Sequence, residues 1–352
     1  MRIALLLLGF GHVARRFVRL LDESRDALGA LDIDAVVVGI ATRRRGARMD
    51  VAGLDAVRIA LQEAESGAIG PASVPSALEW FSRLRSQEIE ARVLVETTPL
   101  DVRSGEPAIS HVRAGLAGGA HVITANKGPV AFAWHTLARE AQTAGVSFLF
   151  EGAVMDGIPI FNLVRETMPA VTIHGFRGVI NSTTNFMLDA LERGGAFDDA
   201  LRQMQAAGVA EADPSLDLDG WDAAAKTAAL ANVLLGAETT PPAIAREGIG
   251  RDTAARAVAE RAAGRRLKLV ASAAGRGRAC AAAVRLEALD LSDPLAILDG
   301  QANALELDTT PLGRVVITQR DGGLEKTAYA LLADLVTVAR RVRHGAPPRT
   351  AN

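Results

Sequence analysis

A glycine-rich turn near the start of the chain restricts the fold more than any other feature. It follows an apolar run of strand length, Arg2–Leu8, and leads into a helical pattern that continues to Leu21. Such a run is typical of a parallel strand that is buried on both faces. Residues 9–14 read GFGHVA, so G-x-G-x-x-A stands between a strand and a helix, which is the context that a dinucleotide-binding turn requires.

The small residues of this turn have separate physical roles in binding a dinucleotide. Gly9 permits the tight turn, Gly11 lets the backbone approach a pyrophosphate, and Ala14 allows close packing of the helix on the strand. The N–H groups at the helix N-terminus would then bind the phosphates. His12 either faces these phosphates or is exposed at the helix start. The predicted cofactor-binding turn also includes Phe10, His12 and Val13.

Three arginines follow the second predicted strand, Asp34–Ile40. An NAD-specific site usually ends this strand with an acid that binds the ribose 2′-OH. Here residues 41–45 read ATRRR, and arginine binds phosphate in a bidentate manner. The loop therefore favours NADP over NAD, with Arg43 as the best candidate because it lies nearest the strand end. The alternative is an arginine-rich surface loop in an arginine-rich protein.

Polar residues also end two further predicted strands. Residues 96–99, ETTP, follow the strand at 92–95, and residues 126–128, NKG, follow the strand at 120–124. Ligands of open α/β sheets bind at the carboxyl ends of the strands. We therefore expect Thr97, Thr98 and Lys127 at the sheet edge where cofactor and substrate meet.

The composition supports a large α/β protein and argues against several other classes. The chain has 352 residues, 49% of them hydrophobic, which is enough for two domains with a substantial core. A net charge of −2 gives no electrostatic reason to expect nucleic acid or an anionic membrane as a partner. The lone Cys280 excludes an internal disulfide framework. The expectation is a cytoplasmic protein with a small-molecule substrate.

Lysine is rare in this chain, with four lysines among thirty-five arginines. Arginine is effectively always protonated, whereas lysine can give and take a proton. Lys226 lies four residues after Asp222 on an apolar helix face, so it is a candidate proton donor held by an acid, or else part of an ordinary surface ion pair. Lys268 and Lys326 are expected to snorkel or to lie at surfaces.

Two polar segments in the middle of the chain accompany Lys226. Residues 181–186, NSTTNF, follow a predicted strand at 171–180 and open a helix, which by itself is only a capping signal. Residues 211–222 hold five acids. They lead directly into the alanine-rich helix that carries Lys226.

Four motifs in this order resemble the homoserine dehydrogenase family over about residues 2–340. They are GFGHV at 9–13, ANK at 125–127, GVINSTTNF at 178–186, and DPS at 213–215 with DGWDAAAK at 219–226. The resemblance implies reduction of L-aspartate 4-semialdehyde to L-homoserine with NAD(P)H, on the route to threonine, methionine and isoleucine.

The resemblance also assigns roles by position. It makes Lys226 the proton donor and Lys127 a second active-site lysine, and it makes Glu211 the carboxylate that receives the substrate ammonium. It places Asp217 and Asp222 in the same pocket, with Thr183 in the turn that contacts the substrate. A loop that in the family holds a monovalent cation such as sodium, largely through carbonyl groups, corresponds to Glu151, Val154, Asp156 and Ile158.

The chain departs from the family pattern at several points. Ser182 replaces a glycine beside the substrate, and Asp156 stands in a loop that is usually glycine-rich. Of a glycine-rich turn near the end, only Gly323 matches, and it is added to the predicted cofactor site. The chain leaves no room after about residue 343 for a regulatory domain, so feedback inhibition through one is not expected.

The predicted architecture is α/β, with a Rossmann-type dinucleotide-binding domain over 1–130 and an α/β substrate and dimerisation domain over 131–323. A helix at about 324–342 would return to the first domain, and 343–352 would fray. We expect a homodimer or a higher homo-oligomer. Alternatives are a sister dehydrogenase of a related hydroxy amino acid and a non-catalytic NADP-binding regulator.

Overall fold

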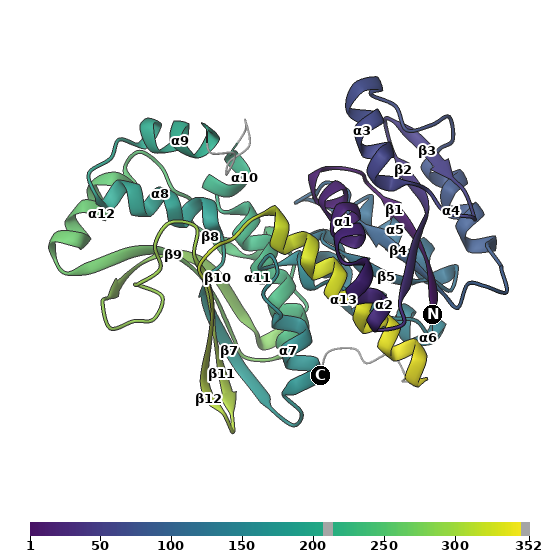
Figure 1. Ribbon diagram of the computed structural model, residues 1–352. Coiled ribbons are helices and arrows are strands. Elements are labelled where there is room, and N and C mark those ends of the chain that lie inside the picture. Colours follow the sequence, from purple (N-terminus) through teal and green to yellow (C-terminus); the bar gives the residue numbers. More distant parts are fainter. Residues whose placement is uncertain (207–213, 346–352) are drawn as a thin grey trace. The chain divides into compact units, whose positions relative to one another are not determined.

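The computed structural model describes residues 1–206 and 214–345. The chain forms two compact units. The first consists of Met1–Thr167 together with the C-terminal segment from Leu324, and the second is Met168–Gly323. Each unit contains a six-stranded sheet with helices, which confirms the predicted α/β class (Figure 1).

The sheet of the first unit has the strand order β3-β2-β1-β4-β5-β6. All of its pairs are parallel except β2 with β3. The strands are β1 (Arg2–Leu8), β2 (Asp34–Thr42), β3 (Gly46–Met49), β4 (Ala91–Glu96), β5 (His121–Thr124) and β6 (Phe148–Leu149). Because β1 has β2 on one side and β4 on the other, the order reverses at β1. A ligand is therefore expected beyond the carboxyl ends of β1 and β4.

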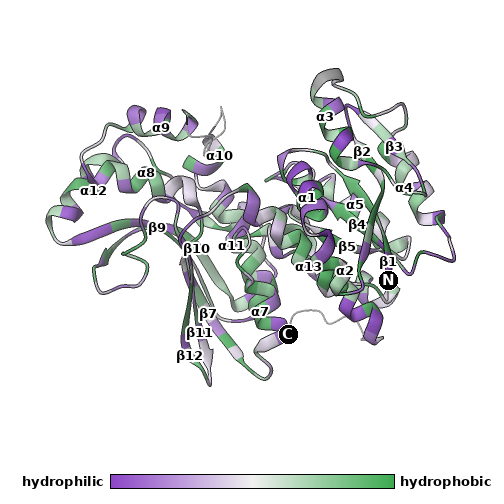
Figure 2. Cartoon of the chain, viewed as in Figure 1, coloured by the Kyte–Doolittle hydropathy of each residue, from purple (hydrophilic) through white to green (hydrophobic). Residues whose placement is uncertain are grey.

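The first unit also contains several helices. They are α1 (His12–Glu23), α2 (Arg25–Ala30), α3 (Ala56–Ser66), α4 (Val74–Arg83), α5 (Ala108–Ala117), α6 (Lys127–Ala144), α7 (Ile160–Thr167) and α13 (Leu324–His344), with a short 3-10 turn η1 (Glu151–Ala153). Helices α1 and α13 share the core on one face of the sheet. The strands are mostly green in Figure 2, as expected for strands buried on both faces. Alternate residues such as Ile3, Leu5 and Leu7 face the core formed with α1 and α13.

The first unit extends beyond the boundary expected near residue 130. Strand β6 pairs with β5, and α13 contacts η1, so residues 131–167 share this core. Helix α13 packs against α1 and continues to His344. The expectation of a frayed tail concerns mainly residues 346–352, which lie outside the described residues.

The sheet of the second unit has the order β12-β11-β7-β9-β10-β8, and its pairs are antiparallel except β8 with β10. Its strands are β7 (Thr172–Val179), β8 (Ala245–Arg246), β9 (Arg265–Ala274), β10 (Ala281–Asp290), β11 (Asn303–Thr310) and β12 (Gly313–Gln319). Its helices are α8 (Ser182–Glu192), α9 (Phe197–Ala206), α10 (Ser215–Leu218), α11 (Trp221–Leu234) and α12 (Thr253–Ala262), with 3-10 turns η2 (Pro241–Ala243) and η3 (Gly277–Ala279). Helices α8, α11 and α12 pack on β9.

The prediction for Lys268 was wrong, because its side chain is fully buried in β9 and does not reach the surface. Its Nζ donates to Asn185 Oδ1 at 2.8 Å and to the carbonyl oxygen of Leu298. Asn185 in turn donates to the carbonyl oxygens of Gly300 and Ala302, each at 3.1 Å. Burial, reinforced by the positive charge of Arg266, lowers the pKa of Lys268 to about 8.

In the described residues, no helix combines the length and apolar character needed to cross a bilayer.

Candidate functional site

The glycine turn of the first unit packs directly against the end of β4. Gly9 has a φ of +84°, and a Cβ at this position would lie 2.6 Å from the carbonyl oxygen of Thr97. Thr97 Oγ1 donates to the carbonyl oxygens of Leu8 and Gly9 at 3.1 and 3.2 Å. Only glycine satisfies both the backbone conformation and the close approach. Thr97 therefore fixes the turn by its hydrogen bonds.

The other residues of the turn have different exposures. Gly11 precedes α1, and an added Cβ there would meet no heavy atom of the described chain within 4 Å. His12 is exposed at the helix start, and Val13 is partly buried. Phe10 is buried in the core. Gly11 and the first turn of α1 thus leave open backbone for an anionic ligand, while the Phe10 side chain supports the fold.

The buried carboxylate of Glu96 holds the ends of β4 and β5 together by hydrogen bonds. The sequence alone did not indicate this role. Glu96 is fully buried, and it accepts hydrogen bonds from the Thr98 amide and from Thr124 Oγ1, both at 3.0 Å. Asn126 Nδ2 donates to the Thr98 carbonyl at 2.8 Å, and Asn126 also caps α6 through the Gly128 amide. Lys127 is the first residue of α6. These bonds bring Thr97, Thr98 and Lys127 to one sheet edge.

Two remaining cofactor candidates differ in their surroundings. Arg43 is exposed in the turn after β2, whereas Arg45 in the same turn pairs with Glu63 of α3. Gly323 has a φ of +123° immediately before α13 and is exposed. The positive φ explains why glycine stands at this position.

In the second unit, Lys226 lies in a compact polar cluster. Its Nζ donates to the Ile180 carbonyl at 2.7 Å and lies 3.1 Å from Asp222 Oδ2. Asn181 Nδ2 donates to Asp222 at 2.9 Å and to Asp217 at 2.7 Å. The side chains of Lys226 and Asp222 are only 12% and 15% exposed. The cluster therefore holds one ammonium group beside two carboxylates in a largely desolvated place.

Asn181 positions this cluster, although the sequence indicated only a capping role for it. Its Oδ1 caps α8 by accepting the Thr184 amide at 2.8 Å, and its Nδ2 reaches the two acids. Thr183 is buried in the same turn and hydrogen-bonds Asp217. Burial, together with the neighbouring Asp222, raises the pKa of Asp217. Glu211, the third acid expected to belong here, lies outside the described residues.

Ser182 is also in the α8 turn, and it has a partner that the sequence did not reveal. Asn303 Nδ2 at the start of β11 donates to Ser182 Oγ at 2.8 Å. Asn303 is 2% exposed, and its Oδ1 has no hydrogen-bond partner in the described residues. The contact arises because β11 pairs with β7, whose end leads into the turn, so no local sequence signal could predict it.

Comparison with known proteins decides the family. Residues 9–151 match the model described as "Homoserine dehydrogenase, NAD binding domain", and residues 159–336 match the model described as "Homoserine dehydrogenase". The chain belongs to the homoserine dehydrogenase family. It is therefore an NAD(P)-dependent oxidoreductase of the class that acts on a CH–OH donor.

Homoserine dehydrogenases of several organisms align along nearly the whole chain. The NAD(+)-dependent homoserine dehydrogenase of Pseudomonas canavaninivorans is 34% identical over 337 residues, with 95% of each chain covered. The homoserine dehydrogenase of Sulfurisphaera tokodaii is 32% identical over 338 residues, covering 96% of this chain and 98% of that protein. The solved structure from Thiobacillus denitrificans has a TM-score of 0.81 at 29% identity and covers 100% of this chain and 77% of its own.

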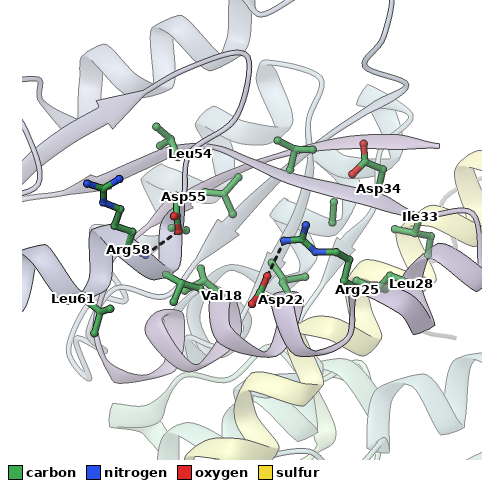
Figure 3. Close-up of a pocket in the computed structure, with 16 residues that line it drawn as sticks. Val18, Asp22, Arg25, Leu28, Ile33, Asp34, Leu54, Asp55, Arg58 and Leu61 are labelled. Atoms are coloured by element: carbon green, nitrogen blue, oxygen red, sulfur yellow. Dashed lines mark hydrogen bonds and ion pairs between the residues drawn. The ribbon is translucent and has the colours of Figure 1, made fainter.

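One cavity of this protein lies outside the predicted site. A cavity of about 640 Å³ lies among α1, α2, β2 and α3 (Figure 3). It is bounded by apolar residues such as Leu28 and Leu54 and by the paired Asp22 and Arg25. It touches the first half of β2 rather than the carboxyl end, and none of the predicted site residues lines it. The cofactor site is therefore expected elsewhere on this unit.

The expected cation loop of this homoserine dehydrogenase uses its acidic side chains internally. The carboxylate of Glu151 accepts the amides of Phe161 and Asn162 at 2.9 and 2.6 Å, and thus caps α7. Burial and the neighbouring Asp334 raise the pKa of Glu151 to about 8. Asp156 accepts a hydrogen bond from Thr327 Oγ1 at 3.2 Å. Both oxygens of the Glu151 carboxylate accept amides of α7. The backbone carbonyl groups of the loop are therefore the candidate cation ligands.

Proposed function

We propose that the chain interconverts L-aspartate 4-semialdehyde and L-homoserine, with NADP as the preferred cofactor and Lys226 as the proton donor. The observation that carries this proposal is the cluster of Lys226, Asp222 and Asn181. A mobile proton is needed in a desolvated place where an alkoxide develops, and a lysine held by an acid can provide it. The product would serve the synthesis of threonine, methionine and isoleucine.

In this proposal the reaction is a hydride transfer coupled to a proton transfer. Reduced nicotinamide, when bound, would supply the hydride to the aldehyde carbon, and the carbonyl electron pair would move to the oxygen. Lys226 would give its proton to that alkoxide and be re-protonated from solvent. Asp222 holds the ammonium in place, and Lys127 adds positive charge as the second lysine.

The same proposal assigns the binding of the substrate to acids and a helix turn. Glu211, by the family resemblance, and Asp217 would receive the substrate ammonium, and Thr183 and Ser182 would contact its carbon chain. The neighbouring N-terminus of α8 favours a carboxylate, because its amides and dipole are positive there. The thiol of Cys280, whose pKa is raised by burial, offers no activated nucleophile for an acyl-enzyme reaction.

The cofactor preference follows from the arginine turn after β2. Exposed Arg43 can bind a 2′-phosphate, and no acid ends β2 to bind a ribose 2′-OH. Among the relatives, the P. canavaninivorans protein is described as NAD(+)-dependent, and the structure of a hyperthermophilic archaeal homoserine dehydrogenase mutant, 25% identical with a TM-score of 0.77, was solved with NADPH. The glycine turn with Thr97 and Thr98 would serve either cofactor.

Initial rates of NADPH and NADH oxidation with aspartate 4-semialdehyde test this function. We expect turnover with both cofactors and a higher kcat/KM with NADPH. Acetaldehyde serves as the control substrate, because it lacks the ammonium and carboxylate groups that the acids and the α8 turn would bind. Failure to oxidise either cofactor at saturating aspartate semialdehyde would refute the proposed reaction.

We also propose that a monovalent cation such as sodium binds the loop that contains Glu151, Val154, Asp156 and Ile158. Carbonyl groups would be its main ligands, since the Glu151 carboxylate caps α7. Such a cation would fasten the loop to the start of α13 through Asp156 and Thr327.

We propose a homodimer or higher homo-oligomer formed by the second unit. In the described residues β12 is an edge strand, and Leu312 and Val316 at this edge are 54% and 40% exposed. Sedimentation equilibrium at micromolar concentration should give a multiple of 36.9 kDa. Val316→Glu should weaken the association, whereas Val258→Glu on α12, also exposed, should not; a single-chain mass for the unaltered protein would contradict the proposal.

A further inference from the structure

A buried carboxylate connects two turns of the predicted cofactor site, namely the glycine turn after β1 and the arginine turn after β2. Glu63 of α3 is 4% exposed. One of its oxygens pairs with Arg15 of α1, and the other pairs with Arg45 in the turn after β2. Arg45 Nη2 also donates to the Phe10 carbonyl of the glycine turn at 3.1 Å. Glu63 thus ties the arginine turn to the glycine turn.

These bonds divide the three consecutive arginines into two kinds. Arg43 and Arg44 are exposed, while Arg45 is held by Glu63 and Phe10. The turn itself is fixed by Thr42, whose Oγ1 accepts the Arg45 amide at 3.0 Å and donates to the Gly46 carbonyl at 3.2 Å. Two arginines therefore remain to meet an incoming phosphate, and the third is committed to the loop.

The charge of Glu63 opposes the field of this arginine cluster. A carboxylate repels a phosphate dianion, and a screened repulsion of about 1.4 kcal/mol is enough to weaken binding by about tenfold. The 5′-phosphate would be less affected, because the amides of the α1 N-terminus would bind it. Binding of the 2′-phosphate is then expected to depend more strongly on Glu63.

We propose that Glu63 is a specificity-determining residue for the cofactor, because its charge offsets Arg15 and Arg45 and so limits the preference for a 2′-phosphorylated nucleotide. The proposal rests on the function proposed above, in which the arginine turn binds the 2′-phosphate. Glu63 leaves the site able to use a nucleotide without that phosphate as well.

Calorimetric titration of the full chain with 2′,5′-ADP and 5′-AMP tests the proposal. Glu63→Gln should lower the Kd for 2′,5′-ADP by about tenfold and change the Kd for 5′-AMP by less than about twofold. Equal changes for both nucleotides, or no change for either, would overturn it. Neither ligand contains nicotinamide or needs the aldehyde, so this result is independent of whether the chain has homoserine dehydrogenase activity.

Two further variants separate local charge from other effects. Glu140→Gln removes the same charge from α6, where Glu140 pairs with Arg113 at 3.0 Å, and it should leave the ratio of the two Kd values unchanged. If it shifts the ratio as much as Glu63→Gln does, net charge explains the effect and the proposal fails.

Should Glu63→Gln not fold, Arg45→Gln provides the opposite test. It should weaken 2′,5′-ADP several-fold relative to 5′-AMP, and an unchanged ratio would overturn the proposal.

Discussion

Replacing Lys226 by arginine is expected to lower kcat by about 10²–10⁴-fold, the range that a positioned general acid contributes. Arginine keeps the positive charge beside Asp222 and the Ile180 carbonyl, but it does not release a proton near neutral pH. Binding of NADPH should be unchanged, because the exchange keeps the positive charge and alters none of the residues predicted to bind the nucleotide. The loss should therefore appear in turnover and not in cofactor affinity.

The experiment measures kcat with saturating aspartate semialdehyde and, separately, the Kd of NADPH by fluorescence titration. Lys326→Arg is the matched control, since it makes the same exchange at a lysine outside the proposed site. Circular dichroism checks that both variants fold. A Lys226→Arg enzyme with nearly unaltered kcat would show that this lysine is not the proton donor.

Lys268 is expected to make the second unit more stable as the pH rises from about 8 to 10.5. In the folded protein the pKa of Lys268 is lowered to about 8 from its ordinary value of 10.5. Between these values the unfolded chain binds the proton and the folded chain does not, so the free energy of unfolding increases with pH. A difference of two and a half pKa units corresponds to about 3 kcal/mol. Below pH 8 both states are protonated, and the whole cost of burying the charge is present.

Urea unfolding of the wild type and of Lys268→Met at pH 8 and pH 10 measures this contribution. Subtracting the two proteins removes the titration of the groups they share. The wild type should gain about 2 kcal/mol over the variant between the two pH values. If the difference between the wild type and Lys268→Met is the same at both pH values, the pKa of Lys268 is not lowered.

Local sequence patterns predicted those parts of the molecule that depend on neighbours in the chain. The glycine turn required only the run of residues 2–14, and the pairing of Asp222 with Lys226 required only helical spacing. The strand before the glycine turn, the α/β class and the family membership were predictable for the same reason. Scarcity of lysine, by contrast, gave no information about where each lysine lies.

Residues whose roles depend on distant partners could not be predicted in this way. Lys268 is buried because Asn185, 83 positions away, accepts its hydrogen bond. Asn303 meets Ser182 across 121 positions, and Glu63 meets Arg15 across 48. Such contacts exist only once the sheets are assembled, so composition and periodicity do not contain them.

The first unit is assembled from two pieces of chain that are separated by the whole of the second unit. Its core contains Leu331, Leu335 and Val338 of α13 next to Ile3 and Leu5 of β1. A ribosome makes β1 before the second unit and α13 after it, and domains fold as units during synthesis. The apolar sheet face of the nucleotide-binding unit that α13 covers therefore stays uncovered until the second unit has been made, and the second unit can fold ahead of it. A chain that is interrupted before α13 should aggregate through that face, even though every residue of the glycine turn is already present.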